Sequence, residues 1–102
     1  MPNETYTKIS EVTIQDLVNY LRLPELDSSQ TQLLTTIKAA AVNYIVGVTG
    51  LALVALDNYP ELTIALYTLC QDMYDNRTIY VDKGTVSETV STILNMYRTN
   101  LL

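Results

Sequence analysis

The chain has 102 residues, enough for one small domain with a modest core. Its 48% hydrophobic content excludes a disordered chain. Its net charge of −5 argues against a nucleic-acid-binding protein, because binding to phosphates requires clustered Lys and Arg. Only 17% of the residues are charged, so the surface is either buried in part against neighbouring subunits or covered by Thr, Asn and Gln in a monomer.

At the start of the chain, we expect residues 1–12 to form a flexible arm, because polar residues surround only isolated apolar ones. The first helix is predicted to begin after Thr13, whose hydroxyl can cap free N–H groups and which has Asp16 at capping-box spacing. We expect this helix to end at Leu23, because Pro24 pushes the preceding residue out of the α region. Its apolar stripe consists of Ile14, Leu17, Val18 and Leu21.

The second helix is predicted over Ser29–Val48, with Ser29 and Gln32 at capping-box spacing. Gly47 and Gly50 are expected to supply the left-handed conformation that helix C-termini favour. The apolar residues that recur at helical spacing are Leu33, Leu34, Ile37, Ala41, Tyr44, Ile45 and Val48.

The apolar run Leu51–Leu56 fits a buried strand, a helical turn or a packed loop, and periodicity cannot decide for so short a run. We favour a connecting loop with some helical turn, because no partner strand is evident. The clearest helical pattern follows over Leu62–Arg77, preceded by Pro60, where a first helical residue tolerates proline. The residues of its buried face are Leu62, Ala65, Leu66, Leu69, Cys70, Met73 and Tyr74.

An extended link is predicted over Thr78–Val81, followed by a last helix that opens with Thr85 and Glu88 at capping-box spacing. The apolar face of that helix consists of Val86, Val90, Ile93, Leu94 and Tyr97, and residues 99–102 form a C-terminal tail. The predicted fold is all-α: a single domain over residues 1–102, built as a small bundle of about four helices with short connections. Its core pair is expected to be Ser29–Val48 and Glu61–Arg77.

The residues that carry catalytic chemistry are scarce. The sequence has no histidine and one cysteine, Cys70, which excludes Ser-His and Cys-His catalysis, histidine metal sites and an internal disulfide. Asp72 and Asp75 share a helix without a third ligand, and the eight tyrosines are expected at core and interface edges. We therefore predict a structural or binding protein that is not an enzyme and holds no cofactor or metal.

The start of the chain has no basic region followed by an apolar run, so we expect no secretory signal. The longest apolar run, Leu51–Leu56, is far too short to cross a bilayer. We therefore expect an intracellular origin and no membrane contact.

Four short patterns lie in a fixed order from Thr13 onward. Thr13–Leu21 reads T-x-x-D-L-x-x-x-L, and Ala39–Gly47 is alanine-rich with Tyr-Ile before a glycine. Pro60–Arg77 begins at proline and ends in Tyr-Asp-Asn-Arg, and Tyr97-Arg98 lies near the last residue. In this order and spacing the chain resembles the small head–tail connector proteins (head completion or adaptor proteins) of tailed phages with long, non-contractile tails. The apolar segment Leu51–Leu56 departs from that pattern.

The resemblance implies a structural virion protein, made in the bacterial host cytoplasm, that forms a ring beneath the portal at the head–tail interface. The ring, a dodecamer on the portal and a monomer in isolation, would extend the DNA channel and dock a stopper or tail completion protein. DNA would pass through it without sequence-specific binding. The residues expected to bind the portal protein are Arg98, Asn100, Leu101 and Leu102. The residues expected at subunit contacts are Ala39, Ala40, Leu51, Leu53, Asp75 and Arg77.

Two alternatives stay open at this point. The chain also fits a small cytosolic helical adaptor or regulatory protein-binding module. Arg77 fits either a cation that completes the dipole of its own helix or an ion pair with an acidic neighbour, which could belong to the next subunit.

Overall fold

The computed structural model describes residues 7–77 and 88–97, and all the regular secondary structure in this part of the chain is helical. The prediction of an all-α fold is confirmed. A 3-10 turn and five α-helices follow one another, and four of the helices have at least eight residues. Their bounds are η1 (Ile9–Glu11), α1 (Ile14–Leu21), α2 (Ser28–Thr49), α3 (Leu53–Leu56), α4 (Pro60–Asn76) and α5 (Glu88–Met96).

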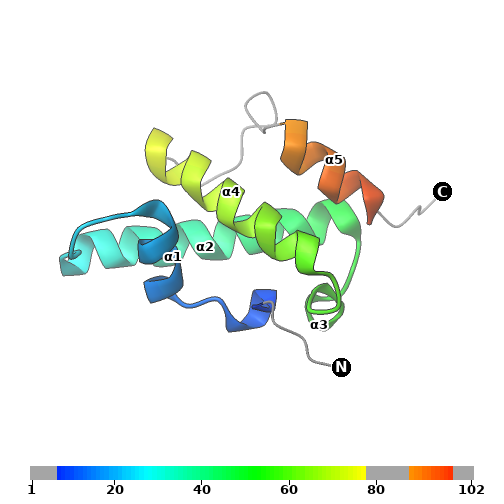
Figure 1. The fold of residues 1–102 in the computed structure, drawn as a ribbon, viewed down its shortest axis with the longest axis horizontal. Helices are drawn as coiled ribbons and strands as arrows, with labels where there is room; N and C mark the ends of the chain where they lie inside the picture. Colours follow the sequence, from blue (N-terminus) through cyan, green and yellow to red (C-terminus); the bar gives the residue numbers. More distant parts are fainter. Residues whose placement is uncertain (1–6, 78–87, 98–102) are drawn as a thin grey trace.

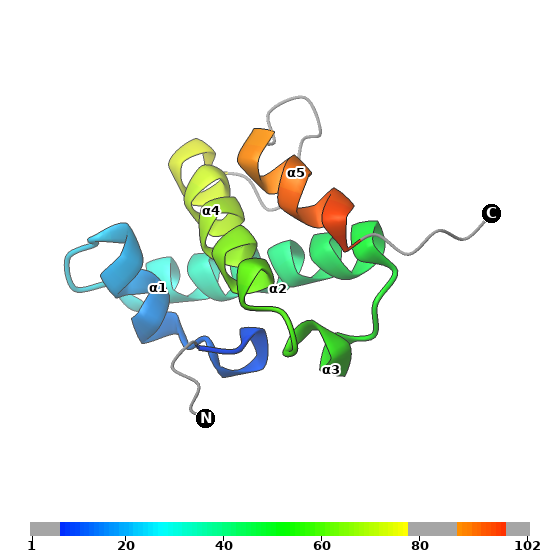
Figure 2. The same cartoon turned by 45° about the vertical axis from the view of Figure 1, so that its right-hand side comes forward.

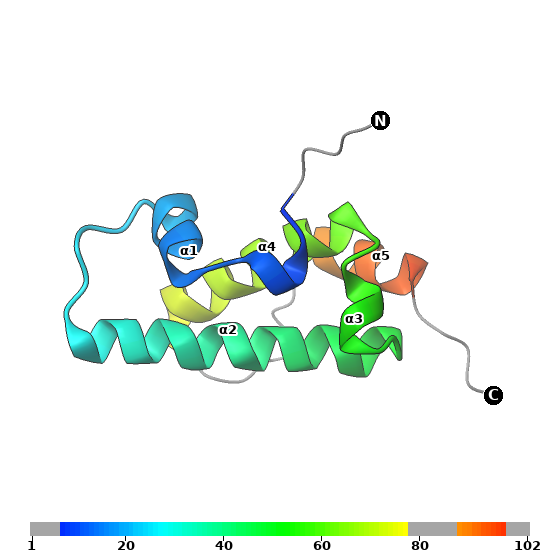
Figure 3. The ribbon, with the colours of Figure 1, turned by 90° about the horizontal axis from the view of Figure 1, so that it is seen from below.

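Helix α2 runs along one side of the bundle, and the other helices all lie on the same side of α2 (Figures 1 and 3). Helix α4 crosses α2 and shares with it the most extensive interhelical contact, as expected for the core pair. Helices α1 and α5 flank α4 on opposite sides, and η1 also packs against it (Figure 2). Every other long helix therefore packs against α4.

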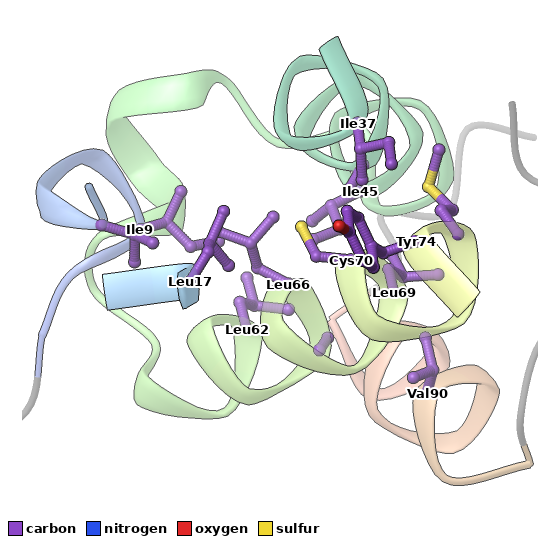
Figure 4. Packing of buried hydrophobic residues seen from close by; sticks show 14 of the residues in the cluster. Ile9, Leu17, Ile37, Ile45, Leu62, Leu66, Leu69, Cys70, Tyr74 and Val90 are labelled. Atoms are coloured by element: carbon purple, nitrogen blue, oxygen red, sulfur yellow. The ribbon is translucent and has the colours of Figure 1, made fainter. Parts of the chain in front are cut away.

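The predicted buried face of α4 is confirmed in full: each of its seven residues is at most 6% exposed. Pro60 occupies the first turn, where its missing N–H costs no helical hydrogen bond. In Figure 4 the labelled side chains of α4 point toward Ile37 and Ile45 of α2 and toward Leu17 of α1. The core is thus one cluster that spans all the long helices.

The predicted N-terminal cap of α1 is also confirmed. The Thr13 hydroxyl accepts a hydrogen bond from the Asp16 N–H at 3.1 Å, and the Asp16 carboxylate accepts one from the Thr13 N–H at 3.0 Å. The helix ends at Leu21, before Leu23, because Arg22 adopts a left-handed conformation (φ 57°). The Arg22 and Leu23 N–H groups then donate to carbonyls of the last turn, which satisfies acceptors that the helix leaves free.

The start of α2 differs from the prediction. Asp27, and not Ser29, caps the helix: its carboxylate accepts from the Gln30 N–H at 2.8 Å, and the Gln30 side chain accepts from the Asp27 N–H at 3.2 Å. A carboxylate interacts more favourably than a hydroxyl with the positive end of the helix dipole, so the helix begins at Ser28. At the other end Gly50 is left-handed (φ 73°), as expected, whereas Gly47 lies inside the helix.

The prediction of a flexible arm is wrong for residues 7–12; residues 1–6 lie outside the described residues. Ile9 and Val12 are each 2% exposed and belong to the core. The Ser10 N–H and hydroxyl both donate to the Asp57 carboxylate, at 2.9 and 2.7 Å, and these bonds hold the pKa of Asp57 below its usual value. Two isolated apolar residues three positions apart are enough to anchor this otherwise exposed segment, because α3 and α4 supply a surface for η1.

The segment after α2 is a loop with a single helical turn, α3, as predicted. In α5 the predicted face is confirmed for the described residues: Val90 and Leu94 are buried, while Ile93 and Tyr97 are half-buried. The predicted link Thr78–Val81, the cap Thr85 and Val86 lie outside the described residues.

The core position of α4 predicts a large difference between two neighbouring substitutions. Leu66→Ala should lower the free energy of unfolding by about 2–5 kcal/mol, because it removes a fully buried side chain and leaves a cavity. Ile64→Ala, at a side chain 54% exposed on the same helix, should cost less than about 1 kcal/mol. Urea unfolding followed by circular dichroism measures both. Equal costs would contradict the packing described here.

The cap of α2 predicts a second contrast. Asp27→Ala should lower the free energy of unfolding by about 1 kcal/mol, because the Gln30 N–H loses its acceptor. Ser29→Ala should change it by less than about 0.5 kcal/mol, because Ser29 is exposed within the first turn. Thermal and urea unfolding of the two variants test this prediction. A larger loss of stability for Ser29→Ala would indicate that Ser29 is the cap.

Candidate functional site

The residues predicted from the sequence to make contacts fall in four places. Arg98, Asn100, Leu101 and Leu102 lie outside the described residues. The other six lie on α2 (Ala39 and Ala40), at α3 (Leu51 and Leu53) and at the C-terminal end of α4 (Asp75 and Arg77). The structure does not unite these three places in one site, so each is described separately.

The first surface is the α3 ridge, formed by Leu53 and Val54. Leu53 is 54% exposed and Val54 is 77% exposed, so the ridge presents two aliphatic side chains to solvent. The ridge rests on Leu56, which is fully buried. The hydrogen bonds from Ser10 to Asp57, directly after α3, tie the turn to η1. The ridge is therefore a fixed projection of the bundle.

The predicted residue Leu51 is half-buried against the core and contributes less to this surface than expected. Val54 is the more exposed member of the ridge and was not among the predicted contact residues. All six residues of Leu51–Leu56 are apolar, so only the packing of the turn against η1 decides which of them face outward.

The second surface is the α1–α2 groove, a hollow of about 370 Å³ where α1 meets the middle of α2. Its lining consists of Ile14 from α1 and Thr35, Lys38, Ala39, Val42 and Asn43 from α2. Ala39 is exposed, as a contact residue should be, and its small side chain helps to leave the groove open. Ala40 is half-buried against the core and does not line the groove.

A second hollow of about 550 Å³ adjoins this groove and shares Ile14 with it. It lies between α1 and the connection to α2, and polar and charged residues such as Gln15, Asn19 and Glu25 contribute to its lining. The sequence did not single out Ile14, Lys38 or Val42, because helical periodicity places Ile14 on the apolar stripe of α1 without showing that this stripe borders a hollow.

The third surface is the C-terminal end of α4. Arg77 is left-handed (φ 53°), and its backbone N–H donates to the carbonyls of Met73 and Tyr74. Its guanidinium donates to the Tyr74 carbonyl at 2.7 Å and lies 4.3 Å from the centre of the Tyr74 ring. These contacts are those of a cation that completes its own helix. Asp75 is exposed on the same turn.

The four tyrosines predicted on or beside the apolar stripes lie in the core or at its edge. Tyr74 is 6% exposed, and Tyr44, Tyr67 and Tyr97 are half-buried. The Tyr97 hydroxyl donates to the Glu61 carboxylate at 2.8 Å, and the Tyr59 and Tyr97 ring centres are 4.5 Å apart. The bond to Glu61 raises the pKa of Tyr97.

Cys70 is fully buried, and burial raises the pKa of its thiol to about 12. In the part of the chain that the structure describes, no group of three or more His, Cys, Asp or Glu side chains is placed to hold a metal ion. Within the same residues, no helix is long and apolar enough to span a membrane.

Comparison with known proteins adds no assignment: no family model, no curated protein and no solved structure matches the chain. The features of the chain that bear on its function are therefore the sequence patterns, the α3 ridge, the α1–α2 groove and the end of α4.

The contacts of Arg77 predict that its substitution acts on the stability of the fold, and this effect can be distinguished from an effect on assembly. Arg77→Ala should lower the free energy of unfolding by about 1–2 kcal/mol, because the guanidinium contacts are lost while a residue with a Cβ stays left-handed. Arg77→Gly should be less destabilising, because glycine adopts that conformation without strain. Urea unfolding measures both variants. A fully stable Arg77→Ala protein that no longer assembles would instead indicate an ion pair to another subunit.

Proposed function

We propose that the chain is a structural subunit of a phage head–tail connector, which forms a ring beneath the portal and docks a stopper or tail completion protein. The proposal assigns it no catalytic activity, cofactor or membrane contact. Its first support is the order of the four sequence patterns from Thr13 to Arg98. The observation that carries it is the exposure of two separate apolar surfaces, the α3 ridge and the α1–α2 groove, on one small bundle.

Two different surfaces are what a ring requires. In a cyclic assembly with more than two members, each subunit uses one patch toward the preceding neighbour and another toward the following one. The α3 ridge lies beside the C-terminal end of α2, whereas α1, which borders the groove, lies over the N-terminal half of α2 (Figures 1 and 3). The two surfaces are therefore available at the same time. A single apolar patch would instead favour a two-fold dimer.

The size of the α3 ridge also fits an assembly that needs a template. Full burial of a Val or Leu side chain is worth about 1.5–3 kcal/mol, and Leu53 and Val54 are already partly buried. Their additional burial would contribute roughly 3 kcal/mol, whereas association costs about 4–15 kcal/mol in lost freedom. One such contact cannot hold two free subunits together. A portal that binds every subunit would supply the remainder, and the free protein is expected to be a monomer.

The charge balance supports the same reading. DNA that passes through a channel must not adhere to its wall, and a net charge of −5 per subunit repels phosphates. The charge also keeps free subunits apart until they are held together.

The test is co-expression of the chain with the portal protein encoded in the same genome, followed by purification of the portal and electron microscopy. We expect a ring of additional density on one end of the portal. Val54→Asp should abolish the ring, because it places a charge on the α3 ridge, while Ile64→Asp, equally a polar change at an exposed aliphatic residue, should leave it intact.

A portal that purifies without the chain under these conditions would refute the connector function and favour the regulatory binding module. Deletion of residues 100–102 separates the portal-binding prediction from the rest. Loss of portal binding by a variant with unchanged unfolding supports the assignment of Asn100, Leu101 and Leu102 to the portal contact, and unchanged binding contradicts it.

A further inference from the structure

We propose that the α3 ridge of one copy of this chain inserts into the α1–α2 groove of the next copy. The inference rests on the proposed function and deepens it, because it names the two halves of the subunit contact and gives the contact a direction.

The two surfaces are compatible in apolar character and in size. The ridge is a projection of two aliphatic side chains, Leu53 and Val54, on a turn that leaves both exposed. The groove has an apolar lining from Ile14, Ala39 and Val42. Its volume of about 370 Å³ corresponds to roughly a dozen water molecules at ~30 Å³ each, which leaves room for both side chains. Transfer of the ridge into the groove would release that water.

The groove cannot be filled by the ridge of its own chain. Asp57 accepts two hydrogen bonds from Ser10, and Leu56 is buried beneath the ridge. Helix α3 is thereby fixed beside the C-terminal end of α2, away from α1 (Figure 3). A ridge that fills the groove must therefore come from another molecule, and a second copy carries one of suitable chemistry.

The charges around the two surfaces favour the same pairing. Lys38 is the one charged residue in the lining of the groove. Near the ridge, Asp57 directly follows α3, and Glu11 and Lys8 belong to the adjoining η1 segment, so these three groups together carry a negative charge. The hydrogen bonds from Ser10 favour the ionised form of Asp57. Ridge against groove therefore brings opposite charges together, whereas ridge against ridge would bring like charges together.

A contact of this kind is directional. Each copy gives its ridge to one neighbour and receives the ridge of another, so the contact either closes into a ring or continues as an open chain. A symmetric dimer through the ridge alone would not use the groove.

The proposal can be tested by cross-linking between introduced cysteines on the portal-bound protein and on the concentrated free protein. Val54→Cys marks the ridge, Ala39→Cys marks the groove, and Ile64→Cys is a control at another exposed aliphatic residue, on α4. A short bis-maleimide is the probe. The native Cys70 does not interfere, because it is buried and its thiol has a pKa of about 12.

A mixture of the Val54→Cys and Ala39→Cys proteins should give cross-linked pairs, and neither protein should give them alone. A chain with both substitutions should give a ladder of multimers on the portal. The mixture of Ile64→Cys and Ala39→Cys should give a yield about tenfold lower, and Lys38→Glu in the groove should reduce the productive yield by a similar factor.

Several results would overturn the pairing. Cross-linked pairs from Val54→Cys alone would indicate a symmetric ridge contact, and equal yields with Ile64→Cys would indicate random collision. No cross-linking in a sample whose portal carries a ring would refute the ridge-in-groove contact and leave the connector function standing. A portal without a ring would refute the connector function itself.

Discussion

The burial of α4 on several sides is the constraint on which the rest of the structure depends. Its apolar residues form one wide face, and α2, α1, α5 and η1 all pack against the helix at once. Each of these elements also has an outer face that does not contact α4, and these outer faces form the surface of the bundle. The α3 ridge and the α1–α2 groove both arise in this way, at the margins of the core. The surfaces that carry the proposed function therefore lie at the edges of the core.

The sequence predicted what depends on local pattern and missed what depends on long-range contact. Periodicity identified every buried apolar residue of α4, and the side chains of Thr13 and Asp16 identified the start of α1. The start of α2 was wrong because Asp27 and Ser29 each precede a glutamine by three residues, so spacing alone could not rank them. The burial of Ile9 and the exposure of Val54 were beyond local pattern, since both are decided by the contact between η1 and α3.

The candidate contact surfaces show the same division. Of the residues predicted at subunit contacts, Ala39 and Leu53 are exposed, whereas Ala40 and Leu51 are half-buried against the core. A groove exists only where two helices diverge, so its lining from α1 and α2 could not be read from either helix alone. Arg77 is the intermediate case: its place at the end of α4 was evident from the pattern, but its bond to the Tyr74 carbonyl required the structure.

The contact between Tyr59, Glu61 and Tyr97 has a mechanical consequence. Tyr97 lies at the end of α5, and its hydroxyl and ring are held by residues at the start of α4. Tyr59 is in turn bonded through its N–H to the Leu56 carbonyl of α3. A tensile load applied to the chain beyond Tyr97 would therefore be shared in shear between α5 and the base of α4, and would not peel α5 away one turn at a time. The contacts of Tyr97 with Tyr59 and Glu61 would thus protect α5 from unfolding under such a load.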